Sequence, residues 1–266
     1  MRDAARTRDA LPRRDLVAIL IGMSGVTLLA WIYLVTSAAR MTDMAMPAMP
    51  DMPDMVQLRV WSPADFLLMF AMWAVMMVGM MVPTAIPMTL LYAAVARKAG
   101  RQNTPLPPTA VFVMGYVSTW TLFSAAATVL QFGLERAALL SPMMVSNSPL
   151  LGAATLLAAG VYQWTPLKKL CLRHCRAPAH FFSEHWRDGT LGAFRMGVDH
   201  GAYCLGCCGF LMLLLFVGGV MNLLWVATIA LFVLAEKVSP FGERAGQVAG
   251  AALTVLGLLA LMRLLI

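Results

Sequence analysis

Seven stretches of this chain are apolar over lengths close to that of a membrane crossing. A transmembrane helix needs about 20 apolar residues to span the hydrocarbon core of a bilayer. The stretches are residues 16–37, 64–96, 109–133, 149–170, 191–217, 221–235 and 246–266. Because backbone polar groups in lipid must pair within the chain, we expect an all-α, polytopic bundle of transmembrane helices. Seven spans are predicted, or six if the short stretch 221–235 does not cross.

The composition places the chain outside the range of soluble domains. Hydrophobic residues make up 60% of it, charged residues only 12%, and the mean hydropathy is +0.75. A lipid bilayer is therefore the first partner that the sequence predicts.

Basic residues alternate between the connections and so predict an orientation. They gather before the first stretch, between the second and third, and between the fourth and fifth: Arg2, Arg6, Arg8, Arg13, Arg14; Arg97, Lys98, Arg101; Lys168, Lys169, Arg173, Arg176, Arg187. The other connections carry few, such as Arg40, Arg59 and Arg136. By the positive-inside rule the N-terminus lies in the cytoplasm and, with seven spans, the C-terminus outside. The net charge of +7 reflects this topology, so no nucleic-acid partner is expected.

Three cysteines and a histidine share one face of the predicted helix at 191–217. His200, Cys204, Cys207 and Cys208 are spaced i, i+4, i+7 and i+8, and Asp199 precedes them. Ionisable groups at membrane depth are costly and usually functional. Thiolate and imidazole are ligands for soft metals, which predicts a metal site; packing by small residues is the alternative.

Methionines dominate the first outside segment and the second apolar stretch. Met41, Met44, Met46, Met49, Met52 and Met55 punctuate a segment of Asp, Ala and Pro. Thioethers select Cu(I), so this segment is either a copper-collecting loop or a low-complexity linker. In the second stretch Met76, Met80 and Met81 precede Pro83 and Pro87, which predict a broken helix.

The depth of these methionines agrees with that of the cysteines. At about 1.5 Å per residue, Met80 lies about 24 Å and Cys204 about 20 Å from the cytoplasmic ends of their spans. The two groups are predicted to face each other near the midplane. Flexible packing is the alternative role for the methionines.

A second Cys/His group is predicted on the cytoplasmic loop after the fourth stretch. Cys171, His174 and Cys175 are followed by His180 and His185. This donor set suits Cu(I) or Zn²⁺, and the alternative is a pair of reduced cytosolic cysteines. Two further pairings are expected: Ser118 and Thr119 in an interhelical contact, and Glu236 with Lys237.

Several blocks together resemble a known family. They are MWAVMMVGMMVPTAIPM (72–88), YQWTPLKKLCLRHCRAP (162–178), HGAYCLGCCGFLM (200–212) and the later Glu236-Lys237. They are similar to the bacterial predicted metal-binding integral membrane proteins, a domain of unknown function, over about residues 60–245. The resemblance implies a polytopic inner-membrane protein that binds metal.

Four parts of the chain are therefore expected. They are a basic cytoplasmic N-terminus (1–15), a first membrane anchor (16–37), a Met-rich periplasmic loop (38–63) and a multi-span metal-binding domain (64–266). The anchor is too long for the core of a signal peptide.

The leading hypothesis is a membrane protein that binds Cu(I) and transports or delivers it. The metal ligands would be His200, Cys204, Cys207, Cys208, Asp199, Met76, Met80, Met81, Cys171, His174 and Cys175. A periplasmic copper carrier or a cuproprotein under assembly would be the partner. The alternatives are a thiol redox enzyme using Cys204 and Cys207, and a non-catalytic assembly factor with a structural metal site, with Zn²⁺ as the alternative ion. The sequence contains no phosphate loop, nucleotide motif or nucleophile triad, so no enzymatic activity is expected.

Overall fold

The computed structural model describes residues 11–45, 61–98, 106–141 and 144–265. Within these ranges the chain is helical, with one isolated β-bridge between Leu140 and Ser146 and no strand. The expected all-α helical bundle is confirmed.

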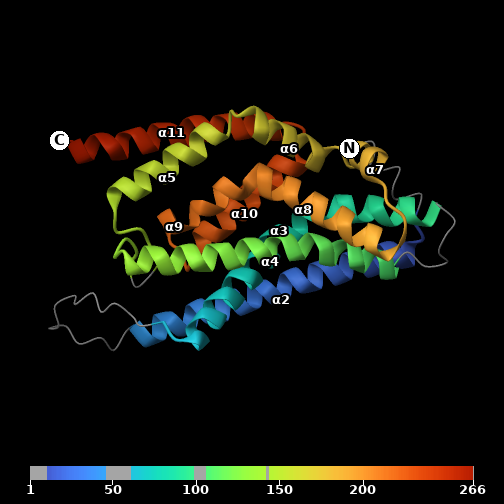
Figure 1. The fold of residues 1–266 in the computed structure, drawn as a ribbon, viewed down its shortest axis with the longest axis horizontal. Coiled ribbons are helices and arrows are strands. Elements are labelled where there is room, and N and C mark those ends of the chain that lie inside the picture. The colour runs from blue at the N-terminus through green and yellow to red at the C-terminus, as the bar shows by residue number, and fades with distance from the viewer. Residues whose placement is uncertain (1–10, 46–60, 99–105, 142–143, 266) are drawn as a thin grey trace.

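Ten helices are described. They are α2 (Arg13–Ala45), α3 (Pro63–Lys98), α4 (Leu106–Arg136), α5 (Pro149–Tyr162), α6 (Pro166–Arg176), α7 (Pro178–His185), α8 (Gly189–Leu213), α9 (Leu215–Gly218), α10 (Leu223–Val238) and α11 (Gly242–Leu265). In Figure 1, α2, α4, α8 and α11 run one way along the long axis, and α3, α5 and α10 run the other way. α8 and α10 lie between the α5–α11 pair and α4 in this view.

Five of the described helices are long and apolar enough to cross a membrane: Arg13–Arg40, Pro63–Lys98, Pro108–Arg136, Gly189–Gly218 and Gly242–Leu264. α5 is apolar but shorter. Large apolar side chains remain exposed on the outer helices, including Ile21, Leu122 and Val248, as a lipid-facing surface requires. Seven crossings remain a prediction, since α5 and α10 are short.

The predicted break in the second span is wrong: α3 runs unbroken through Pro83 and Pro87. A proline ring leaves the carbonyl four residues earlier without its helical donor. For Pro83 that carbonyl belongs to Gly79, and the Trp31 indole Nε1–H donates to it at 3.3 Å. The neighbouring helix α2 therefore compensates for the missing bond, and the helix continues.

The segment expected as a cytoplasmic loop is also largely helical. The fourth apolar stretch stops at Tyr162, and α6 starts at Pro166 with the Thr165 side chain accepting from the Lys168 amide at 3.3 Å. Pro166 begins the new helix, because proline suits the first helical position. α6 packs on α8, so its cysteines face the bundle.

Glycines allow the closest helix contacts. A β-carbon at Gly250 in α11 would lie 3.0 Å from the carbonyl oxygen of Gly160 in α5, so these two helices pack closely. Gly115 of α4 and Gly197 of α8 similarly touch the opposing backbone. Between the same two helices, the Thr119 hydroxyl donates to the Val198 carbonyl at 3.4 Å, the interhelical contact expected of that polar cluster.

The Met-rich segment is described only at its start. α2 extends to Ala45, so Met41 and Met44 belong to a helix. Met46, Met49, Met52 and Met55 lie outside the described residues, and the collecting loop stays a prediction.

Candidate metal centre

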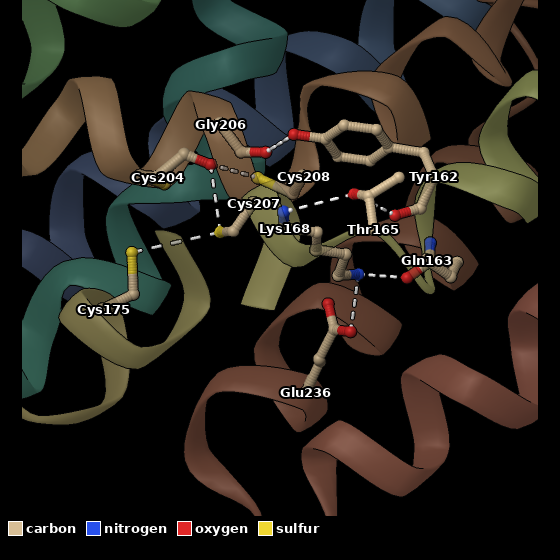
Figure 2. Close-up of polar contacts among 10 residues, drawn as sticks. All are labelled: Tyr162, Gln163, Thr165, Lys168, Cys175, Cys204, Gly206, Cys207, Cys208 and Glu236. Atoms are coloured by element: carbon tan, nitrogen blue, oxygen red, sulfur yellow. Dashed lines mark hydrogen bonds and ion pairs between the residues drawn. The ribbon is translucent and has the colours of Figure 1, made fainter. Parts of the chain in front are cut away.

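The predicted face of α8 is buried in the bundle. Cys204 and Cys208 are 0% exposed, Cys207 is 1% and His200 is 2%. The thiol of Cys207 donates to the carbonyl of Cys204 at 3.1 Å, and that of Cys208 does so at 2.9 Å. The helical spacing thus brings the thiols of Cys207 and Cys208 to one carbonyl, that of Cys204 (Figure 2).

α6 adds two more cysteines to this face. Sγ of Cys175 lies 3.9 Å from Sγ of Cys207 (Figure 2). Cys171, one helical turn earlier, packs on Gly206, where an added β-carbon would lie 2.6 Å from its Sγ. Only glycine at this position lets α6 approach so closely. All five cysteines are free, and they gather at the α6–α8 interface.

A lysine that the metal hypothesis did not include reaches the thiols from α10. Nζ of Lys237 donates to Sγ of Cys204 at 2.7 Å and to Oγ1 of Thr84 in α3 at 3.2 Å. An ammonium beside a thiol favours the thiolate form, which is the form that binds metals. The same ammonium is itself a cation next to this sulfur, at a place where a metal ion would otherwise lie.

Tyr116 of α4 completes the surroundings of Cys204. Its hydroxyl lies 3.0 Å from Sγ of Cys204 and donates to the Met81 carbonyl at 3.1 Å. Side chains of α4 and α10 therefore contact this sulfur of α8, and Thr84 of α3 contacts both of those side chains. Tyr116 reaches it because Gly197 and Gly201 of α8 leave room for α4.

The expected pairing of Glu236 with Lys237 is wrong. Neighbouring residues of a helix point in different directions, so these side chains meet different partners. Glu236 Oε1 pairs with Nζ of Lys168 at 2.6 Å, and Lys168 also donates to Oε1 of Gln163 (Figure 2). This buried ion pair links α10 to α6, and thereby holds Lys237 and the α6 cysteines in register.

His200 and Asp199 occupy different surroundings from the thiols. The His200 ring stacks on Tyr116 with centroids 5.2 Å apart and meets Phe181 edge-on at 5.8 Å. Its buried Nδ1 has no hydrogen-bond partner among the described residues. The Asp199 carboxylate lies 3.9 Å from the guanidinium of Arg187, a residue just before α8.

His174 of α6 packs between α8 and α7. Its ring stacks on Tyr203 with centroids 4.2 Å apart, and its Nε2 lies 3.8 Å from a Glu184 carboxylate oxygen. His174 therefore contacts α8 through Tyr203 and α7 through Glu184.

The predicted methionines lie in the same buried cluster as the thiols. Met76 and Met80 are 1% exposed and Met81 is 0%. Met80 also lines an apolar groove with Trp31 and Pro83. The Met81 carbonyl, rather than its sulfur, makes the described contact with Tyr116.

No ready-made site of three or more His, Cys, Asp or Glu side chains exists in the described part of the chain. The thiols instead contact each other, a carbonyl and Lys237. Contacts with Cys204 and Cys207, together with burial, raise the pKa of the Cys175 thiol well above its ordinary value. A metal would have to replace protons and the ammonium at this place.

A comparison with protein families indicates which metal is involved. A family model named PpoB2 and described as a copper chaperone matches residues 70–260. This chain belongs to the PpoB2 copper chaperone family. The match contains most of α3, all of α4 to α10, most of α11 and all five cysteines, whereas α2 and the Met-rich segment precede it. The PpoB2 family description agrees with the copper predicted from the Met and Cys residues, and is compatible with the metal-binding family that the sequence blocks resemble.

No curated protein matches the chain, and no solved structure does. The family description therefore supports copper handling alone, and residue roles rest on the geometry above.

Proposed function

We propose that this protein holds Cu(I) at the thiols of Cys175, Cys204 and Cys207 and delivers it to a copper-dependent partner. The gathering of five free, mostly buried cysteines at the α6–α8 interface carries the proposal. Thiolates are soft ligands and select Cu(I) over hard ions. In this proposal Cys208, Cys171 and the methionines Met76, Met80 and Met81 surround the ion as further sulfur donors or packing.

The separation of two thiols supports the choice of ligands. Two thiolates that each lie about 2.3 Å from one metal are separated by about 3.8–4.0 Å, depending on whether the site is tetrahedral or trigonal. The Cys175–Cys207 distance is 3.9 Å. A metal can therefore enter between these sulfurs with little movement of α6 against α8.

His200 offers a further donor in this proposal. Its Nδ1 is buried and without a partner among the described residues, one helical turn from Cys204. Buried polar atoms normally have a partner, so an unpaired nitrogen beside a thiol cluster fits a role in metal transfer.

We further propose that the bundle crosses the bacterial inner membrane with its N-terminus in the cytoplasm. The Met-rich periplasmic segment would collect copper, the buried thiols would hold it, and a periplasmic carrier or a cuproprotein would receive it. Weak thioether and strong thiolate ligands in series favour both capture and release.

Metal analysis of purified, reduced protein tests the function. We expect the wild-type protein to retain Cu(I) in preference to Zn²⁺ and the Cys204→Ser, Cys207→Ser, Cys208→Ser triple variant to lose it. Thr36→Ala is the control, because the Thr36 hydroxyl is exposed on α2 and bonds only to carbonyls of its own helix. Stoichiometric Zn²⁺ with no copper after equal exposure would favour a structural zinc site instead.

The contact between Lys237 and Cys204 also favours a second candidate, a thiol redox enzyme. An ammonium 2.7 Å from a sulfur activates a thiol for exchange. One observation opposes it: Cys204 is 0% exposed, so its thiol lacks the access to a substrate that thiol exchange needs. Turnover of a dithiol substrate that depends on Cys204 but not on copper would establish the enzyme.

A further inference from the structure

A basic cleft lies outside the thiol cluster, between α6 and the start of α11. Its volume is about 770 Å³. Lys169, Arg173 and Arg176 line it from α6, and Glu243 and Arg244 line it from α11. These α6 residues lie on the side of the helix away from Cys171 and Cys175, which face α8.

Positive charge predominates in the cleft. Four cationic side chains face a single carboxylate, that of Glu243. The side chains of Lys169, Arg173 and Arg244 have no ion pair or hydrogen bond within the described ranges. Such unpaired charges are suited to an anion, and the planar arginine fork matches two oxygens of a phosphate.

One of the arginines is fixed in place. Nη2 of Arg176 donates to the carbonyl of Ser239 at 2.6 Å and to that of Pro240 at 3.2 Å. This contact ties the end of α6 to the turn between α10 and α11. The cleft is therefore part of the folded bundle and does not depend on a loose surface side chain.

Exposed apolar residues border the same end of the bundle. Leu170 is 53% exposed, Val238 57% and Phe241, itself in the cleft wall, 65%. The basic cleft thus adjoins a surface that suits hydrocarbon. A ligand with a phosphate at one end and acyl chains at the other would cover both parts.

We propose that this basic cleft binds the phosphate group of an anionic phospholipid. A soluble phosphate shares the same head chemistry but leaves the apolar border uncovered, which is why we assign the lipid. The bound lipid would link α6 to the α10–α11 turn and so stabilise the helix that carries Cys171 and Cys175.

Native mass spectrometry of the metal-free, full-length protein in neutral detergent tests the proposal independently of copper. The probes are phosphatidylglycerol, phosphatidylcholine and inorganic phosphate. We expect phosphatidylglycerol adducts to exceed those of phosphatidylcholine. Each basic residue contributes about five-fold near an anionic headgroup, so Arg173→Gln with Arg244→Gln should weaken the adduct about 25-fold.

Two further variants separate charge from folding. Arg195→Gln removes an exposed arginine of α8 outside the cleft and should leave the adduct unchanged. Arg173→Lys with Arg244→Lys keeps the charge and should keep the preference for phosphatidylglycerol. The proposal is overturned if the Gln and control variants behave alike, if the Lys pair loses the adduct as fully as the Gln pair, or if excess inorganic phosphate displaces the lipid.

Discussion

Nζ of Lys237 lies 2.7 Å from Sγ of Cys204, between α10 and α8. Both residues are buried, with exposed fractions of 8% and 0%. The ammonium supports a thiolate in the copper-free protein, yet it repels a second cation at the same sulfur. A copper chaperone must release its ion, and in the proposed site this repulsion would keep the bound ion transferable.

The first prediction follows from that repulsion. Two unit charges 4 Å apart repel by about 4 kcal/mol at an effective dielectric constant of 20. Even a third of this repulsion energy would change the affinity about ten-fold. Lys237→Met should therefore tighten Cu(I) binding by about ten-fold or more and slow transfer to a chelator. Competition with a colorimetric Cu(I) chelator measures both.

Lys169→Met, which changes a lysine of the basic cleft, is the control and should leave copper binding unaltered. Weaker binding in Lys237→Met would mean that the ammonium acts mainly to hold Cys204 as a ligand.

The second prediction concerns the close approach of α6 to α8. A β-carbon at Gly206 would lie 2.6 Å from Sγ of Cys171, so Gly206→Ala should push α6 outward and separate Cys175 from Cys207. Overpacking costs about 1–3 kcal/mol, and copper retention should fall with stability. Thermal unfolding in detergent and copper analysis are the measurements.

Two variants make this result specific. Gly25→Ala in α2, with no atom within 4 Å of the added carbon, should stabilise by about 0.5–1 kcal/mol, as alanine does in a helix. Adding Cys171→Ala to Gly206→Ala removes the clashing sulfur and should restore stability. No recovery in the double variant would place the clash elsewhere.

Part of the candidate site could be predicted from the sequence, because the positions of its residues on α8 follow from helical periodicity. The spacing of His200, Cys204 and Cys207 puts them on one face of any α-helix, and the structure buries that face. In contrast, the prediction that Cys171 and Cys175 form a second group, apart from the thiols of α8, was wrong. Their i, i+4 spacing signals a helix, but only the packing on Gly206 shows that they join the thiols of α8.

Lys237 and Tyr116 were not predicted because their roles depend on tertiary contacts. Lys237 meets Cys204 across 33 positions of sequence and Tyr116 does so across 88. The unbroken α3 likewise depends on Trp31, a residue of another helix. The sequence signal for Lys237 is a lysine directly after the apolar stretch 221–235, and its expected partner was the neighbouring Glu236.

The third prediction is a pH dependence. The pKa of the Cys175 thiol is raised by contacts with Cys204 and Cys207 and by burial, so this thiol is protonated near neutral pH. Copper must displace that proton, and binding therefore strengthens as pH rises, by about ten-fold per unit for one proton. Chelator competition between pH 6 and 8 measures the slope.

Cys175→Ser should bind copper more weakly and lose this one-proton slope. Cys171→Ser, whose sulfur packs on Gly206, is the comparison and should keep it. An unchanged slope in Cys175→Ser would remove Cys175 from the ligand set.

The fourth prediction tests the orientation. A cysteine at exposed Ser62, before α3, should react with an impermeant thiol reagent in whole cells, and one at exposed Ser183 in α7 should not. The wild-type protein, with its five native cysteines, sets the background. The reverse pattern would place the Met-rich segment in the cytoplasm and end its role as a periplasmic collector.

The last prediction asks whether the methionines and the thiols form one site. Met80→Leu with Met81→Leu removes two sulfurs but keeps volume and apolarity, so packing should change by less than about 1.5 kcal/mol. If Met80 and Met81 ligate copper, this pair should weaken binding nearly as much as Cys207→Ser with Cys208→Ser. Combining both pairs should then add little, because partners in one site are not additive. Additive losses of copper affinity would mean that the methionines and the cysteines act at separate places. If the Met pair has no effect, Met80 and Met81 only pack in the buried cluster that contains the thiols.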